Sequence, residues 1–192
     1  MIAFLMGMFF STQAADHVKG NGKLSTKKIT IDDFNAIKFD GVIDFNYEQS
    51  ESTPHIEITV DENLHPYVNI DIQDRVLTVG FANFIANSPL KGDELKINAN
   101  SNCLVQLKQK VEVGKLDLNV SGSANMVVNE LKTDKLECSI NGSGTINLKA
   151  GNAEEADYSI TTDGEIMAFG VAVPEVNCKI TGKGSAQIHP TD

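Results

Sequence analysis

Cysteine and histidine are the side chains of this sequence whose chemistry could mark a metal or redox site. They are Cys103, Cys138 and Cys178, and His17, His55, His65 and His189. The histidines are scattered singly, and none has a ligand spacing such as His-x-x-x-His. We therefore predict no zinc site among them.

Two pairs of carboxylates could serve glycoside cleavage, which needs two facing acidic groups. These are Asp44 with Glu48, and Asp61 with Glu62. No set of nucleophile, base and orienting group accompanies either pair. We therefore predict a protein without catalytic residues or cofactors, and a polysaccharide-active enzyme is the alternative. The Gly142–Gly144 segment is not a phosphate loop, since it lacks the lysine pattern and the following helix.

Three acidic residues, Asp117, Glu137 and Asp157, recur at one constant interval, and Asn177 continues the row. If they stack on neighbouring strands, like charges come close together, which is unfavourable unless solvent or a cation relieves it. One interpretation is a weak Ca²⁺ site built from these oxygen ligands. The other, which we favour, is a solvated acidic stripe that nearby lysines neutralise. Those lysines are Lys115, Lys135 and Lys179.

That interval belongs to a repeat of the C-terminal half, whose period of about 20 residues is within the range of solenoid repeats. The segments 116–120, 136–140, 156–160 and 176–180 align without a gap, and apolar residues alternate with polar ones in each. Alternation is typical of a strand with one buried face, and strict repetition predicts a solenoid of parallel rungs. The inward columns would be Leu116, Leu136, Ala156, Val176; Leu118, Cys138, Tyr158, Cys178; and Val120, Ile140, Ile160, Ile180. A hairpin array is the competing geometry.

A bend rich in glycine and small polar residues follows each strand at the same phase, as a tight turn requires. Its structural glycines are Gly122, Gly142, Gly144, Gly164, Gly182 and Gly184. The bend at 161–164 departs from the pattern, because Thr162 stands where the others have glycine. A second short strand comes next, with inward pairs Met126 and Val128, Ile146 and Leu148, Ile166 and Ala168, and Ala186 and Ile188.

The repeat also decides how we interpret the cysteines. Cys138 and Cys178 share a column two rungs apart, so their Cα atoms should lie about 9.6 Å apart, too far for a disulfide. With Tyr158 between them, we predict small buried thiols in the core. Cys103 lies near a bend at the start of the repeat, either partly exposed or packed against the N-terminal part.

Upstream of the repeat, residues 28–79 show alternating strand segments without the period, which predicts either a cap at the end of the solenoid or a small strand layer packed on it. Leu95, Ile97 and Ala99 form an earlier rung with a spacing of 21. The stretch 80–93 contains asparagine, proline and glycine and is predicted to be a loop. We therefore expect one domain over 16–192, with an irregular N-terminal β half at 28–91 and a regular half at 92–192.

The net charge and the N-terminal segment indicate which ligands are excluded and where in the cell the protein is located. The net charge of −10 repels nucleic acid and anionic lipid. The apolar stretch 1–10, followed by small residues, predicts a signal peptide over 1–15, cleaved after Ala14 or Ala15. That stretch is too short to span a bilayer. We expect an exported protein of the periplasm or cell surface that does not cross the membrane.

The N-terminal pattern resembles a known family. It comprises 31–34 (IDDF) with Ile37, then Gly41 and Val42, then 44–45, then 60–64 (VDENL). Together with the regularly spaced glycine bends, it is similar to the head GIN domain of auto-transporter adhesins. That resemblance implies a right-handed single-stranded β-helix, similar in outline to pectin lyases but without their catalytic residues. It also implies a cell-envelope protein acting in adhesion.

From the regular scaffold and its rows of outward amides and hydroxyls, we expect a protein that binds a surface glycan or an envelope protein. Those outward residues are Asn119, Ser139, Ser159, Asn125, Thr145, Asn147 and Gln187. The plainer interpretation is that such rows keep the solenoid soluble. A structural assembly unit is a further alternative, because the last rung could pair with the edge of another chain to form a homo-oligomer.

Overall fold

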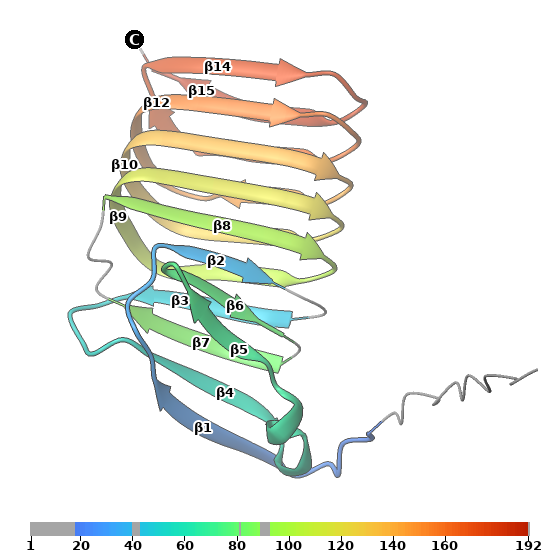
Figure 1. Ribbon diagram of the computed structural model, residues 1–192. Helices are drawn as coiled ribbons and strands as arrows, with labels where there is room; N and C mark the ends of the chain where they lie inside the picture. The colour runs from blue at the N-terminus through green and yellow to red at the C-terminus, as the bar shows by residue number, and fades with distance from the viewer. Residues whose placement is uncertain (1–17, 40–42, 81, 89–92, 192) are drawn as a thin grey trace, which may run out of the picture.

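The computed structural model describes residues 18–39, 43–80, 82–88 and 93–191. Within these residues, fifteen strands form one continuous sheet that winds into a right-handed solenoid of about five turns (Figure 1). The predicted all-β solenoid with regular rungs is confirmed. The N-terminal strands are β1 (Leu24–Thr30), β2 (Ala36–Phe39), β3 (Ile43–Gln49), β4 (His55–Asp61), β5 (Ile70–Gln73), β6 (Val76–Val79) and β7 (Ala82–Ser88), with a 3-10 helix, η1 (Glu62–Tyr67), before β5. The others are β8 (Glu94–Ser101), β9 (Leu104–Gly122), β10 (Asn125–Gly142), β11 (Thr145–Leu148), β12 (Gly151–Ile160), β13 (Glu165–Val173), β14 (Glu175–Ile180) and β15 (Ser185–Pro190).

The sequence repeat sets the register of the stack. In parallel pairing, Leu116 lies beside Leu136, Leu136 beside Ala156, and Ala156 beside Val176. The other two predicted columns follow the same register, and the earlier rung in β8 pairs with β9 at the expected spacing of 21. Ile140 and Ile160 are 1% and 0% exposed, so these columns do face the core. The hairpin array is thereby excluded for the repeat.

The glycine bends lie above one another along one edge of the solenoid. Most of their glycines do not adopt the positive φ angle that we expected the tight turns to require. Of the six predicted glycines only Gly122 has a positive φ, +88°. At Gly142 and Gly144, a Cβ atom would lie 2.0 Å and 2.2 Å from carbonyl oxygens of the rung below. Glycine is therefore required there by close stacking of rungs, not by the turn conformation. Where Thr162 replaces glycine, its hydroxyl lies 2.6 Å from the amide nitrogen of Gly142.

Each rung has a third side that the repeat pattern did not reveal. The segments that return from the second strand to the next first strand are themselves paired: Val111 lies beside Leu131, Leu131 beside Gly151, and Gly151 beside Val171. The apolar members of this row are buried. The core is thus enclosed by three parallel strand layers, of which the sequence predicted two.

The N-terminal strands extend the stack and then close it. β6, β2 and β8 are consecutive parallel neighbours in one layer, and β7, β3 and β9 in the next. Below β7, the strands β4 and β1 run antiparallel and form the cap that the sequence predicted (Figure 1).

Two expectations for this N-terminal part are wrong. Residues 82–88 are strand β7, not a loop, because the buried side chain of Ala86 and the pairing with both β3 and β4 hold the asparagine-rich segment extended. The period is also present upstream, since Ile37 lies beside both Leu77 and Ile97, which follow it by two and three repeat periods. It was hidden because the rung containing β6 and β7 inserts below the earlier rung containing β2 and β3.

The C-terminal end of the stack is open. Cys138 is 0% exposed, but Cys178 of the last rung is exposed, and Ile180 is 41% exposed. The prediction that both thiols are buried is therefore correct for Cys138 and wrong for Cys178. The column continues as predicted, with Tyr158 between the cysteines, but no described rung covers its last member.

Candidate functional site

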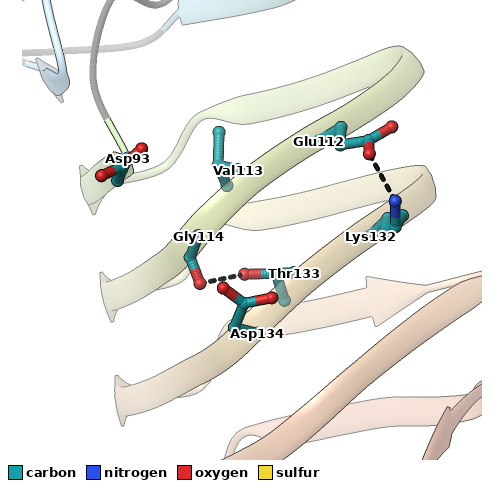
Figure 2. A pocket seen from close by; sticks show the side chains of 7 residues that line it. All are labelled: Asp93, Glu112, Val113, Gly114, Lys132, Thr133 and Asp134. Atoms are coloured by element: carbon teal, nitrogen blue, oxygen red, sulfur yellow. Dashed lines mark hydrogen bonds and ion pairs between the residues drawn. The ribbon is translucent and has the colours of Figure 1, made fainter.

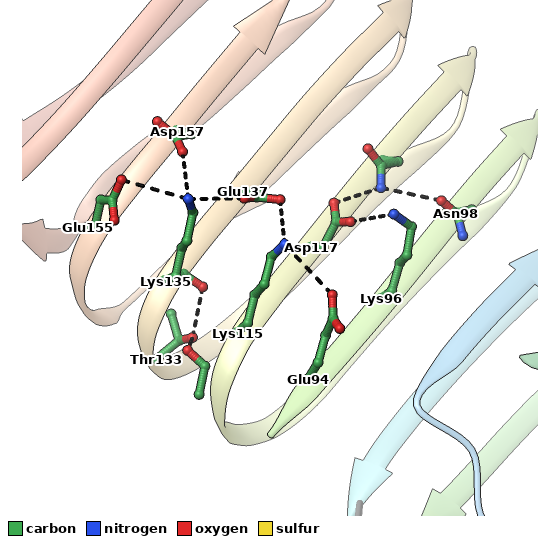
Figure 3. Close-up of polar contacts among 12 residues, drawn as sticks. Glu94, Lys96, Asn98, Lys115, Asp117, Thr133, Lys135, Glu137, Glu155 and Asp157 are labelled. Carbon is green, nitrogen blue, oxygen red and sulfur yellow. Dashed lines mark hydrogen bonds and ion pairs between the residues drawn. The ribbon is translucent and has the colours of Figure 1, made fainter. Parts of the chain in front are cut away.

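The predicted row of acidic residues forms a ladder across the first strands of successive rungs (Figure 3). We call Asp117, Glu137 and Asp157 the carboxylate ladder. The Nζ atom of Lys135 lies 3.3 Å from Glu137 and 3.3 Å from Asp157, and Nζ of Lys115 lies 2.9 Å from Glu137. Ammonium groups thus stand between the carboxylates, where a cation would otherwise relieve their repulsion.

This arrangement favours the lysine-neutralised stripe, and the Ca²⁺ site stays a prediction. Two of the three expected lysines, Lys115 and Lys135, make the contacts. The third lysine on the ladder is Lys96, whose Nζ lies 2.6 Å from Asp117, whereas Lys179 makes no ion pair with any described residue. Among the residues described, no group of three His, Cys, Asp or Glu side chains is arranged to hold a metal ion.

Asp117 is the most enclosed member of the ladder, with a side chain only 8% exposed. Its two oxygens are held by Lys96 and by the amide of Asn119, whose Nδ2 lies 2.7 Å from Oδ1. A carboxylate with so little access to water depends on these donors, because losing one leaves a charge with an incomplete set of partners. The contact between Lys96 and Asp117 should therefore contribute more to stability than the more exposed contacts of Lys115 and Lys135.

Replacing Lys96 by methionine should lower the free energy of unfolding by about 1–2 kcal/mol, because it removes the cation facing an enclosed carboxylate. Denaturant unfolding followed by circular dichroism measures this loss. The matched control is Lys28→Met, which breaks the exposed pair with Glu57 at 3.5 Å and should change stability little. Equal effects of the two substitutions would contradict the special position of Lys96.

The ladder also predicts a pH dependence. The ammonium group of Lys115, more than that of Lys135, lowers the pKa of Glu137. A carboxyl group whose pKa is lower in the folded state stabilises the fold fully above its ordinary pKa, and this contribution is lost as the pH falls through the folded-state value. Wild-type protein should therefore lose stability more steeply than Glu137→Gln as the pH drops below about 4.5. Thermal unfolding between pH 6 and about pH 3 tests this, and parallel curves would contradict it.

The outward polar rows largely bond to one another between rungs. Asn119 Nδ2 lies 3.3 Å from Asn98 Oδ1, Thr145 Oγ1 lies 2.7 Å from Asn125 Oδ1, and Asn177 Nδ2 lies 3.1 Å from Asp157 Oδ1. These bonds hold the side chains in regular positions on a flat outer surface. The rows therefore form an ordered polar surface, as expected.

A pocket of about 540 Å³ opens on the third side of the solenoid (Figure 2). Lys132 and Glu112 form an ion pair of 2.6 Å in its wall, and the hydroxyl of Thr133 bonds to the carbonyl of Gly114 at 3.0 Å. Carboxylates of Asp93 and Asp134 complete the lining. Lys132 is thus paired with a carboxylate and Thr133 with a backbone carbonyl, and the described lining contains no histidine, cysteine or serine.

The structure does not bring the remaining candidates together. Asp44 and Glu48 lie on one strand, about 13 Å apart along its axis, beyond the separation of glycosidase carboxylates. Asp61 and Glu62 are consecutive at the junction of β4 and η1. Cys103 is buried, and burial raises its pKa to about 11, so its thiol stays protonated at neutral pH. His17 lies outside the described residues, as does the predicted signal peptide.

One exposed feature was missed by our sequence reasoning. Phe169 at the end of the second strand in β13 is 67% exposed, and its ring stacks on that of His189 with centroids 5.0 Å apart and planes at 14°. Single exposed apolar side chains are common on protein surfaces, so the feature that distinguishes Phe169 is its stacking on a second ring. The available signal was the break in alternation, because Phe169 occupies the position that Lys149 has one rung earlier.

Comparison with known families decides the assignment. A family model described as "Putative auto-transporter adhesin, head GIN domain" matches residues 33–192. The chain belongs to this family. Head GIN domain proteins are named for adhesion, which suggests an adhesion-like role and an extracellular or cell-envelope location. No curated protein matches the chain.

Solved structures agree with this assignment. A crystal structure of a "putative adhesin" from Parabacteroides merdae ATCC 43184 is 83% identical, with a TM-score of 0.78 over 93% of this chain and 86% of that one. Another "putative adhesin", from Parabacteroides distasonis ATCC 8503, is 54% identical, with a TM-score of 0.78 over 92% and 86%. A "putative lipid binding protein" from the same strain is 24% identical, with a TM-score of 0.69 over 90% and 99%, and at that identity the likeness shows the fold alone. In the described part of this head GIN domain protein, no helix is long and apolar enough to cross a membrane.

Proposed function

We propose that this head GIN domain protein is exported and binds a glycan of the cell envelope without catalysing a reaction on it. Family membership supports adhesion, and the apolar segment 1–10 supports export by a signal peptide removed near Ala15. The proposal assigns no catalytic residue and no cofactor. Its binding surface is the outer face of the second strands.

The observation that carries the proposal is the exposed stack of Phe169 and His189 at the border of this face. Along β13 the outward residues are Glu165, Met167 and Phe169, and β15 lies beside it with Ser185, Gln187 and His189. A flat aromatic surface beside hydrogen-bonding side chains fits a sugar ring, whose apolar face stacks on the aromatic group while its hydroxyls bond to the polar ones. Gln187 and Glu165, 3.3 Å apart, supply such polar groups.

Sedimentation with purified peptidoglycan sacculi, supported by a glycan array, tests the proposal. Wild-type protein should bind, and Phe169→Ala should bind about tenfold more weakly, the scale expected from losing one central aromatic contact. Tyr67→Ala, which removes an exposed aromatic ring in η1, outside the layer of second strands, should bind as wild type does. Absence of wild-type binding to sacculi and to every glycan of the array, or undiminished binding by Phe169→Ala, would refute it.

A further inference from the structure

The two ends of the solenoid are built differently. At the N-terminal end, antiparallel strands β4 and β1 cover the rung containing β7, whereas nothing described covers β14 and β15 at the other end (Figure 1). Val176 is only partly buried, Cys178 is exposed and Ile180 is 41% exposed, although their equivalents one rung earlier are 0–2% exposed. The apolar interior therefore reaches the surface at the C-terminal end.

Hydrogen-bonding edges border this apolar opening. Among the described strands, β14 pairs only with β12, and β15 only with β13, so each has one edge without a partner strand. After β15, the amide of Thr191 bonds to the carbonyl of Val173 at 3.0 Å, which directs the described chain back beside the preceding rung. An open pair of edges with an apolar centre is suited to pairing with other strands.

The charges on β14 match those of a second copy of the same strand. Glu175 and Lys179 face outward from the two ends of the strand, and neither makes an ion pair with a described residue. In the four rungs before it, the same row holds uncharged residues, namely Asn98, Asn119, Ser139 and Ser159, and Lys179 therefore brings a charge to the end of the stack. If two β14 strands run antiparallel with Asn177 at the centre, each Glu175 lies opposite Lys179 of the other copy.

We propose that two copies of this chain dock end to end through β14 and β15, related by a two-fold axis near Asn177. In this register, Val176 lies opposite Cys178 of the second copy, so the exposed inward residues cover each other. The same axis places the two β15 strands side by side, with their partly buried Ala186 and Ile188 facing across it. A self-complementary surface of this kind forms a closed dimer instead of a filament.

The alternative register, with Cys178 at the centre, lacks this charge match. It would place Lys179 opposite Asn177 and Glu175 opposite Thr181, leaving all the charges unpaired. Of these two registers, the one centred on Asn177 satisfies both the charges and the apolar row.

Analytical ultracentrifugation of the full chain should show a dimer. Glu175→Lys and Lys179→Glu should each weaken dimerisation about tenfold or more, because each places like charges opposite one another at two symmetric sites. The double variant should restore it, because the pair is exchanged. All these positions are exposed, so circular dichroism should show an unchanged fold. A monomer at all concentrations, or a double variant as weak as the single ones, would overturn the proposal.

Cross-linking gives a second, independent readout. Val176→Cys should form a disulfide-linked dimer under mild oxidation, because residue 176 lies opposite Cys178 of the second copy within bonding distance. Glu154→Cys, an exposed position in β12, outside the docking strands β14 and β15, should remain unlinked. Cross-linking of Glu154→Cys to the same extent as Val176→Cys would overturn the docking geometry.

Discussion

Gly142→Ala is expected to destabilise the solenoid by about 3 kcal/mol, the upper range for overpacking a closely fitted site. The added Cβ would lie 2.0 Å from the carbonyl oxygen of Gly122 and 2.5 Å from its amide nitrogen. Both are backbone atoms, so no side-chain rotation relieves the contact. The rungs would have to separate where Ser143 donates to Gly122 at 2.8 Å, which weakens that bond as well.

Unfolding in guanidinium, followed by circular dichroism, measures this effect. Ser143→Ala serves as the control, since it changes the neighbouring exposed residue of the same bend and leaves the glycine contact intact. We expect its transition to match that of the wild type. If Gly142→Ala unfolded at the wild-type midpoint, close stacking could not be the reason for glycine in the bends.

Leu118→Ala should cost about 3 kcal/mol, because it opens a cavity in a column where side chains stack from rung to rung. Leu118 is 0% exposed and lies between Ile97 below and Cys138 above. Neighbouring rungs are fixed by their hydrogen bonds, so the backbone cannot close around the smaller residue. The lost contacts therefore remain lost.

The same chemical change at an exposed site provides the comparison. Leu24→Ala shortens a leucine that is 71% exposed at the start of β1, and it should change the free energy of unfolding by less than about 0.5 kcal/mol. Denaturant titrations of both variants give the difference. Similar losses at the two sites would show that the predicted column is not the stabilising core.

Much of the C-terminal fold was predictable because each rung repeats the same alternation of apolar and polar residues and the same bend. Alternation fixes which side chains face inward, and the common phase of Ile140 and Ile160 fixes which strands are neighbours. The third side was missed because its inward positions vary more, with Gly151 in the row that has Val111 and Leu131 below it. A row interrupted by glycine gives little hydrophobic signal.

The N-terminal half was less predictable for a different reason. Its strands carry the right alternation, but their spatial order depends on pairing between segments two and three repeat periods apart, which local pattern does not specify. At the surface, the sequence predicted the carboxylate ladder and two of its lysines. It did not predict the role of Lys96, because that residue lies in the earlier rung, whose spacing of 21 departs from the strict period. It also did not predict the stacking of Phe169 on His189, because the two rings meet only when β13 and β15 are neighbours.

The inserted rung has a consequence for the order in which the protein folds. From β9 onward, each turn finds its neighbour a single repeat period away, so the stack can grow by short loop closures once a first pair has formed. The β2 segment instead pairs with β6 and β8, which lie two and three repeat periods further along the chain. Closing such long loops is slower. We therefore expect the C-terminal turns to nucleate folding and the first-synthesised strands to join last.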